Sequence, residues 1–226
     1  MGKTVFVIHT SAVLWDDLPR LFAEYAPDVT VRNIIDDSLL PEVLANDGVT
    51  PAVMRRFCDY AVQAEAAGAD LVFTQCSSVG EVADMAARML RIPLLKIDER
   101  MAETACQTGS RIGVVATVST TMGPTVRLIR RAANTLGTSV SIIEELSAGA
   151  FEKLTAGDRA GHNRMVIDSI HRVAKKVDVV VCAQGSMLAL KDDLGETSVP
   201  VLFSPPVGVQ HAVEVLAALE ETVPNY

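Results

Sequence analysis

Residues 70–78 read Asp-Leu-Val-Phe-Thr-Gln-Cys-Ser-Ser, and this stretch decides the fold. A short apolar run between polar residues predicts a buried strand, and this one leads into Cys76 and two hydroxyl residues. Residues 178–186, Asp-Val-Val-Val-Cys-Ala-Gln-Gly-Ser, repeat the order of an acid, an apolar strand, a cysteine and a small polar turn. We therefore interpret Cys76 and Cys182 as thiols in equivalent settings, each at the carboxyl end of a strand.

The repeat extends along the whole chain at a nearly constant offset. The offset is 108 residues from Asp70 to Asp178, 106 from Cys76 to Cys182, and 107 both from Thr10 to Thr117 and from Pro93 to Pro200. Near-constant spacing of this kind indicates a duplicated structural unit.

Apolar runs and helical periodicity alternate in both halves, which predicts an α/β fold. The expected strands are Thr4–His9, Val29–Ile35, Leu71–Phe73 and Pro93–Ile97, then Arg111–Ala116, Ser139–Ile143, Val177–Val181 and Pro200–Phe203. The expected helices run from about Leu14 to Tyr25, Leu40–Ala45, Pro51–Ala67, Val79–Leu90, Pro124–Leu136, Ala148–Leu154, Arg159–Lys175, Met187–Leu190 and Val207–Glu221. We expect two pseudo-symmetric lobes, each with a mostly parallel four-stranded sheet flanked by helices. The first lobe comprises residues 1–97 plus 208–226, and the second comprises 98–207.

Composition excludes several classes of protein. The chain has 226 residues, a net charge of −8 and scattered basic residues, which argues against a nucleic-acid-binding surface. No apolar run approaches the roughly 20 residues of a membrane helix, and the amino terminus lacks the pattern of a signal peptide. We expect a cytoplasmic protein with reduced cysteines. None of the cysteines is spaced as Cys-x-x-Cys, so no metal site is predicted, and no nucleotide or pyridoxal phosphate motif is present.

The candidate site lies at the carboxyl ends of the strands, where ligands of open parallel sheets bind. If the lobes face each other, Cys76 and Cys182 approach one cleft from opposite sides, as a base and an acid acting on opposite faces of a carbon. A thiol with an ordinary pKa of about 8.5 can serve in either role. The residues expected to hold the substrate's oxygens are Thr10, Ser11, Ser77, Ser78, Thr117 and Gln184.

Other polar residues have less specific interpretations. His9, near a strand end, either orients a substrate or packs, and Thr117 either contacts ligand or caps a helix. The histidines within helical patterns, His162 among them, are expected at the surface or as caps. Glu144 and Glu145 are expected on solvated turns and faces.

These features resemble the aspartate/glutamate/hydantoin racemase superfamily over nearly the whole chain. Residues 112–117, Ile-Gly-Val-Val-Ala-Thr, are similar to its Gly-Val-Leu-Ala-Thr segment, and residues 182–187 resemble the Cys-Ala-Gly-Met stretch of hydantoin racemases. Residues 9–11, His-Thr-Ser, replace the Asp-Ser of glutamate racemases, Ser77-Ser78 replace Asn-Thr, and Ala183-Gln184 replace Thr-His or Thr-Glu. These departures favour the amino-acid-derivative and non-amino-acid branches.

The resemblance implies a cofactor-independent racemase or epimerase with two catalytic cysteines. It would move a proton at a carbon alpha to a carboxylate or carbonyl of an amino acid, a hydantoin or a related small acid. It also implies a homo-oligomer. Two alternatives stay open: an enzyme like the maleate isomerases or arylmalonate decarboxylases of the same superfamily, or a non-catalytic protein that binds small molecules.

Overall fold

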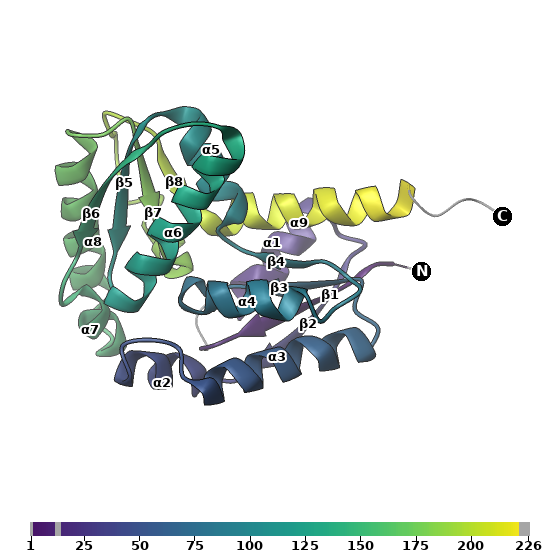
Figure 1. The fold of residues 1–226 in the computed structure, drawn as a ribbon. Helices are drawn as coiled ribbons and strands as arrows, with labels where there is room; N and C mark the ends of the chain where they lie inside the picture. The colour runs from purple at the N-terminus through teal and green to yellow at the C-terminus, as the bar shows by residue number, and fades with distance from the viewer. Residues whose placement is uncertain (1, 12–14, 222–226) are drawn as a thin grey trace. The chain divides into compact units, whose positions relative to one another are not determined.

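The computed structural model of the protein describes residues 2–11 and 15–221. The chain divides into two compact units, one formed by the residues up to Ile97 together with those from Pro205 onward, the other by Asp98–Ser204. Each unit contains a four-stranded sheet in which every strand pair is parallel. The predicted α/β architecture with two helix-flanked sheets is therefore confirmed (Figure 1). No helix within the described ranges is long and apolar enough to span a membrane.

The first sheet has the strand order β2-β1-β3-β4. Its strands are β1 (Thr4–His9), β2 (Thr30–Ile35), β3 (Leu71–Thr74) and β4 (Leu94–Lys96). The helices of this unit are α1 (Asp17–Tyr25), α2 (Leu39–Ala45), α3 (Pro51–Ala66), the short 3₁₀ helix η1 (Ser77–Val79), α4 (Gly80–Ala87) and α9 (Ser204–Glu221). The expected beginning of the first helix near Leu14 lies outside the described residues.

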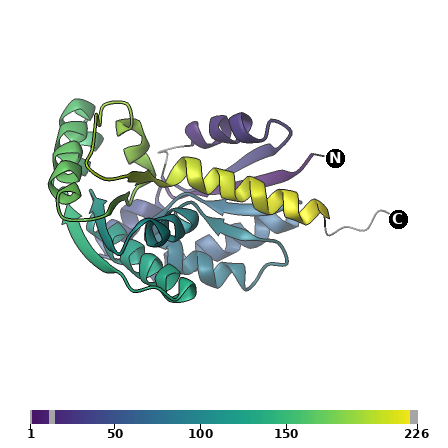
Figure 2. The ribbon, with the colours of Figure 1, turned by 90° about the horizontal axis from the view of Figure 1, so that it is seen from above.

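Helices cover both faces of the first sheet. Successive side chains of a strand point to opposite faces, so each face packs against its own helices. Phe6 and Ile8 of β1 pack with Phe57 and Ala61 of α3, whereas Val5 and its neighbours pack against α1 and α9. Figure 2 looks down on the second of these faces and shows α9 lying over the strands. The central strands β1 and β3 are apolar on both sides for this reason.

The second sheet has the order β6-β5-β7-β8. Its strands are β5 (Arg111–Ala116), β6 (Ser141–Leu146), β7 (Val179–Cys182) and β8 (Val201–Phe203). Its helices are α5 (Glu99–Thr108), α6 (Ser119–Leu136), α7 (Ala150–Thr155), α8 (Arg159–Ala174) and the 3₁₀ helix η2 (Gly185–Leu190). Helices α5 and α6 cover one face of this sheet, and α7, α8 and η2 cover the other.

Corresponding aspartates fix the start of the third strand in each unit. Asp70 Oδ2 accepts a hydrogen bond from the backbone N–H of Thr4 at 2.8 Å, and Asp178 Oδ2 accepts one from Arg111 at 2.8 Å. The helix caps correspond too, since the side chains of Thr50 and Asp158 each accept a backbone hydrogen bond in the first turn of α3 and α8. The two halves of the chain therefore repeat their local structure in detail.

Three parts of the predicted secondary structure are wrong. Helix α5 is absent from the predicted elements, and α6 begins at Ser119 with Pro124 inside it rather than at its start. Strand β6 extends to Leu146, three residues beyond its predicted end at Ile143, although Glu144 is exposed to solvent as expected. A charged pair is tolerated there because β6 is an edge strand with much of its surface in water.

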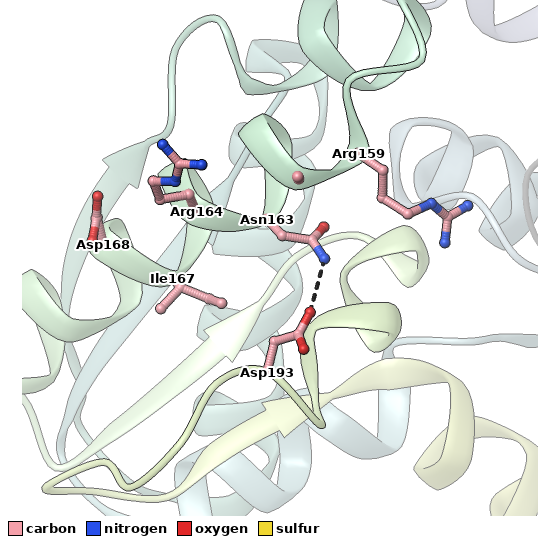
Figure 3. A pocket seen from close by; sticks show the side chains of 7 residues that line it. Arg159, Asn163, Arg164, Ile167, Asp168 and Asp193 are labelled. Atoms are coloured by element: carbon pink, nitrogen blue, oxygen red, sulfur yellow. Dashed lines mark hydrogen bonds between the residues drawn. The ribbon is translucent and has the colours of Figure 1, made fainter.

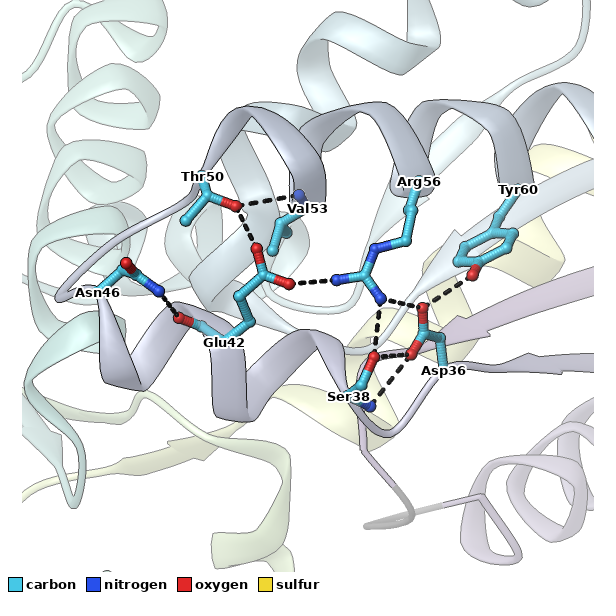
Figure 4. Close-up of polar contacts among 8 residues, drawn as sticks. All are labelled: Asp36, Ser38, Glu42, Asn46, Thr50, Val53, Arg56 and Tyr60. Atoms are coloured by element: carbon cyan, nitrogen blue, oxygen red, sulfur yellow. Dashed lines mark hydrogen bonds and ion pairs between the residues drawn. The ribbon is translucent and has the colours of Figure 1, made fainter.

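A polar network joins the end of β2 to α2 and α3 (Figure 4). Arg56 of α3 donates to Asp36 at 2.9 Å and to Glu42 of α2, and Tyr60 donates its hydroxyl to Asp36 at 2.8 Å. Burial disfavours the charged form of Asp36, but the hydrogen bonds from Ser38 and Tyr60, with the charge of Arg56, outweigh it and lower the pKa of the carboxyl. This network holds two helices at one edge of the sheet.

Candidate functional site

The carboxyl ends of β1 and β3 bring several predicted residues together in the first unit. Ile8 and Thr74 are register partners on these two parallel strands. Two residues beyond each partner come Thr10 and Cys76, and residues two apart along a strand point to the same face. Thr10 is completely buried, whereas Cys76 is only partly buried. A hydroxyl and a thiol therefore lie next to each other at this edge.

Cys76 occupies the position that precedes η1, with extended backbone. Burial raises the pKa of its thiol, while the side chain of Thr10, the backbone N–H and hydroxyl of Ser78, and the backbone N–H of Val79 all lower it. Ser77 and Ser78 are themselves buried. Cys76 is thus a thiol at neutral pH whose thiolate, once formed, would meet several hydrogen-bond donors.

Unpartnered polar atoms concentrate at the same edge. Within the described ranges, the buried side-chain atoms His9 Nδ1, Thr10 Oγ1 and Thr74 Oγ1 have no hydrogen-bond partner. The interaction of Thr10 with the Cys76 thiol is therefore weaker than a standard hydrogen bond. Leaving a buried polar group unpaired costs about 1–3 kcal/mol, so a cluster of such groups is expected to bind ordered water or a ligand.

His9 is the last residue of β1 and is completely buried. Its Nε2 lies 2.8 Å from Oδ1 of Asn33 on β2. An amide oxygen only accepts hydrogen bonds, so Nε2 carries the hydrogen and Nδ1 is left as an acceptor. Burial lowers the pKa of the imidazole and the contact with Asn33 opposes this, with a net decrease, so His9 is neutral. Of the two roles left open for His9, an unpaired acceptor at the strand end favours contact with a ligand.

In the second unit, Thr117 and Gln184 form a reciprocal pair. The backbone N–H of Thr117 donates to Gln184 Oε1 at 2.6 Å, and Gln184 Nε2 donates to Thr117 Oγ1 at 2.8 Å. Both residues were predicted to hold the substrate, and they lie together just beyond the ends of β5 and β7. Each end of the Gln184 carboxamide is occupied by Thr117.

Cys182 differs from its predicted setting. It is the last residue of β7, paired in register with Val115 and Phe203, and its side chain is completely buried. The side chains packed around it are apolar, including Ile170 and Met187. Burial raises the pKa of Cys182 well above the ordinary range, and no nearby donor opposes it among the causes of this shift. Cys182 is therefore a buried thiol in an apolar cluster.

The pairing register of the strands contradicts the expected equivalence of the two cysteines. Ile8 pairs with Thr74 in the first sheet, and Val115 pairs with Cys182 in the second. Cys182 accordingly corresponds to Thr74, not to Cys76. Cys182 therefore lies two residues before the position equivalent to Cys76. At about 3.3 Å per residue, the two positions are roughly 6.6 Å apart along the strand.

Two other polar residues of the first sheet, Thr74 and Asn33, have no predicted functional role. Thr74 directly follows a predicted strand and precedes a polar turn, which is the usual signal for a strand end. Asn33 is a polar residue within a predicted strand, which could have indicated a partner for His9. The prediction of surface or capping roles for the helical histidines is wrong for His162, which is buried in α8.

An open pocket of roughly 570 Å³ lies along α8. Figure 3 shows Arg159 and Arg164 projecting from the helix, with Asn163 hydrogen-bonded to Asp193 at 3.2 Å. None of the predicted site residues lines this pocket. No group of three or more residues suited to hold a metal ion occurs in the described parts of the chain.

Comparison with known proteins adds to this geometry. The sequence profile of a family described as Asp/Glu/Hydantoin racemase matches residues 5–212. None of the curated protein sequences matches. A solved glutamate racemase from Francisella tularensis subsp. tularensis SCHU S4, in complex with D-glutamate, is similar with a TM-score of 0.76 at 10% identity, over 100% of this chain and 85% of that chain.

Two further solved structures share the fold. Allantoin racemase from Klebsiella pneumoniae has a TM-score of 0.68 at 18% identity, covering 97% of this chain and 89% of that chain. A mutant of arylmalonate decarboxylase has a TM-score of 0.57 at 16% identity, covering 95% of this chain and 93% of that chain. At such identities the similarity establishes the fold, and the chemistry must be argued from the residues.

Proposed function

Because this chain belongs to the Asp/Glu/hydantoin racemase family, we propose that it is a cofactor-independent enzyme that moves a proton at a carbon alpha to a carboxylate or carbonyl. Cys76 is the acid or base in this proposal, and the substrate is an amino acid, a hydantoin or a related small acid. The observation that carries it is the sheet edge at which a partly buried thiol adjoins the buried Thr10 side chain and the backbone N–H groups of Ser78 and Val79.

The surroundings of Cys76 suit proton transfer. A thiol can give up its proton only if the resulting thiolate is stabilised, and the N–H groups of Ser78 and Val79 supply that stabilisation. The reaction also places negative charge on a substrate oxygen as the alpha carbon loses its proton. Positioned donors such as the Thr10 hydroxyl can stabilise that charge.

The family resemblance suggests a specific form of this chemistry, a two-base 1,1-proton transfer. One of Cys76 and Cys182 would remove the alpha proton, and the other, as a thiol, would protonate the opposite face of the carbon. Ser11, Ser77, Ser78, Thr117 and Gln184 complete the proposed set of substrate contacts with Thr10.

A second candidate is a lyase or cis–trans isomerase in which one thiol acts. The burial of Cys182 in an apolar cluster favours this candidate, because a sulfur held there has no donor to stabilise its thiolate. In such an enzyme Cys76 protonates a carbanion or attacks the substrate, and Cys182 contributes to packing.

Exchange of alpha protons with deuterated buffer tests the proposal whatever the net reaction is. Proton NMR would follow amino acids, 5-substituted hydantoins, hydroxy acids, malonates and maleate. We expect Cys76→Ser to lower the rate on the active compound by about 10²–10⁴-fold. Cys58→Ser, which alters another partly buried thiol in α3, is the matched control and should leave the rate unchanged. Full activity in Cys76→Ser would refute the role of this thiol.

A further inference from the structure

We propose that Gln184 holds in the second unit the position that Cys76 holds in the first. Because only Cys76 then provides a thiol at this position, the enzyme removes and returns its proton on one side of the carbon only. This inference rests on the proposed role of Cys76 and selects its second form, a lyase or cis–trans isomerase in which one thiol acts, over the two-base form. Cys76 is the single thiol that acts, and Gln184 is the residue that determines this specificity.

Strand register gives the first line of evidence. Thr74 of β3 is paired with Ile8 and Lys96, and Cys182 of β7 is paired with Val115 and Phe203. These pairings make Thr74 and Cys182 counterparts on both of their neighbouring strands. Two residues further along each chain segment come Cys76 and Gln184, which are therefore counterparts as well. Their separation of 108 residues equals that of the strand-starting aspartates.

The backbone gives independent evidence. Cys76 precedes η1 with φ −116° and ψ 112°, and Gln184 precedes η2 with φ −131° and ψ 137°. The carbonyl of Cys76 accepts a hydrogen bond from the N–H of Val79 at 3.3 Å, and that of Gln184 accepts one from Met187 at 3.1 Å, three residues on in both cases. The two residues start the same local turn.

The neighbouring threonines correspond too. Thr10 lies two residues beyond Ile8, and Thr117 lies two residues beyond Val115, the register partner of Cys182. In the first unit the Thr10 side chain interacts with the Cys76 sulfur, and in the second the Thr117 hydroxyl accepts from Gln184 Nε2. A threonine therefore adjoins the second residue after the third strand in both units.

The chemical difference lies in what the two residues can do with a proton. A carboxamide offers N–H donors and an oxygen acceptor but has no titration near neutral pH. Gln184 is in addition held at both ends by Thr117. It can bind a substrate oxygen and cannot take a hydrogen from carbon.

The proton-transfer step then balances on a single sulfur. The Cys76 thiol first loses its proton to solvent. The thiolate then takes the alpha hydrogen, the C–H electron pair moves into the enolate, and the sulfur becomes a thiol again. In deuterated buffer this thiol exchanges its hydrogen for deuterium and returns it to the same face of the carbon. The alpha hydrogen is exchanged and the configuration is retained.

Alkylation with iodoacetamide, followed by peptide mass spectrometry, tests the positions of the sulfurs without a substrate. In the folded wild-type protein we expect Cys76 to be modified and Cys182 to stay unmodified over the time that Cys76 needs for completion. In Gln184→Cys, the introduced thiol should be modified on the time scale of Cys76. Modification of Cys182 as fast as Cys76, or protection of the introduced thiol, would overturn the assignment.

The second part of the test is chiral analysis of the compound whose alpha proton the enzyme exchanges in deuterated buffer. The wild-type enzyme should exchange the alpha proton of one enantiomer without inversion, and Gln184→Cys should add inversion. Inversion by the wild-type enzyme that disappears in Cys182→Ala would refute the one-sided mechanism while leaving the proposed function intact. Exchange that survives Cys76→Ser would instead refute the proposed function itself.

Discussion

Replacement of Cys182 by serine should destabilise the second unit through one unpaired hydroxyl. The side chain has no exposed surface and is surrounded by apolar groups, so the serine oxygen would find no partner. An unsatisfied buried polar group costs about 1–3 kcal/mol. For a chain of this size each kcal/mol lowers the melting temperature by about 2–4 °C, which gives a decrease of about 2–12 °C.

Cys106→Ser is the matched control for this substitution. Cys106 is also buried, at 7% exposure, but its Sγ donates to the carbonyl of Ile129 at 3.4 Å, so a serine hydroxyl keeps an acceptor. Thermal unfolding followed by circular dichroism should show a clearly smaller decrease for Cys106→Ser than for Cys182→Ser. Equal melting temperatures for the two variants would refute the reasoning that Cys182 lacks a polar neighbour.

Two further substitutions and one pH series test other features of the fold. Gly113→Ala should cost about 1–3 kcal/mol in urea unfolding, because a Cβ there would lie 2.1 Å from Cγ1 of Val173, and wild-type stability would contradict this close packing. Thr50→Ala removes the acceptor for the N–H of Val53 and should cost about 1 kcal/mol in the same assay. The pKa of Asp36 is lowered in the folded protein, so its stabilisation is present above the usual carboxyl pKa and is lost as the pH falls through the folded value. The difference in melting temperature between wild type and Asp36→Asn should therefore shrink below about pH 4, and a difference independent of pH would contradict it.

The sequence predicted the architecture well because strand order and helix faces follow from patterns that a single chain displays. β1 and β5 have the predicted bounds, and α3 places Val53, Phe57 and Ala61 on one buried face at a spacing of four residues. Helix α5 was missed although the repeat contains a signal for it. It follows β4 as α9 follows β8, and 108 residues separate Glu99 from Val207, where the last helix was expected to begin.

The candidate site was predicted in part. Thr10, Cys76, Ser77 and Ser78 do meet at one sheet edge, because residues that follow neighbouring parallel strands must lie close together. The sequence matched Cys182 to Cys76 by residue type, although their offset is two residues shorter than the offset of the flanking aspartates. Hydrogen-bond register distinguishes a residue inside a strand from one beyond its end, and composition alone does not.

The division of the chain has a consequence for its synthesis. The first unit is discontinuous, since α9 packs on Val5, Leu18 and Phe73 although more than a hundred residues separate it from them. All elements of the second unit come from one continuous stretch. A ribosome therefore releases the complete second unit while one face of the first sheet still lacks its last helix. Truncation before Ser204 should leave that apolar face open to chaperones and to aggregation, although every residue of the candidate site would be present.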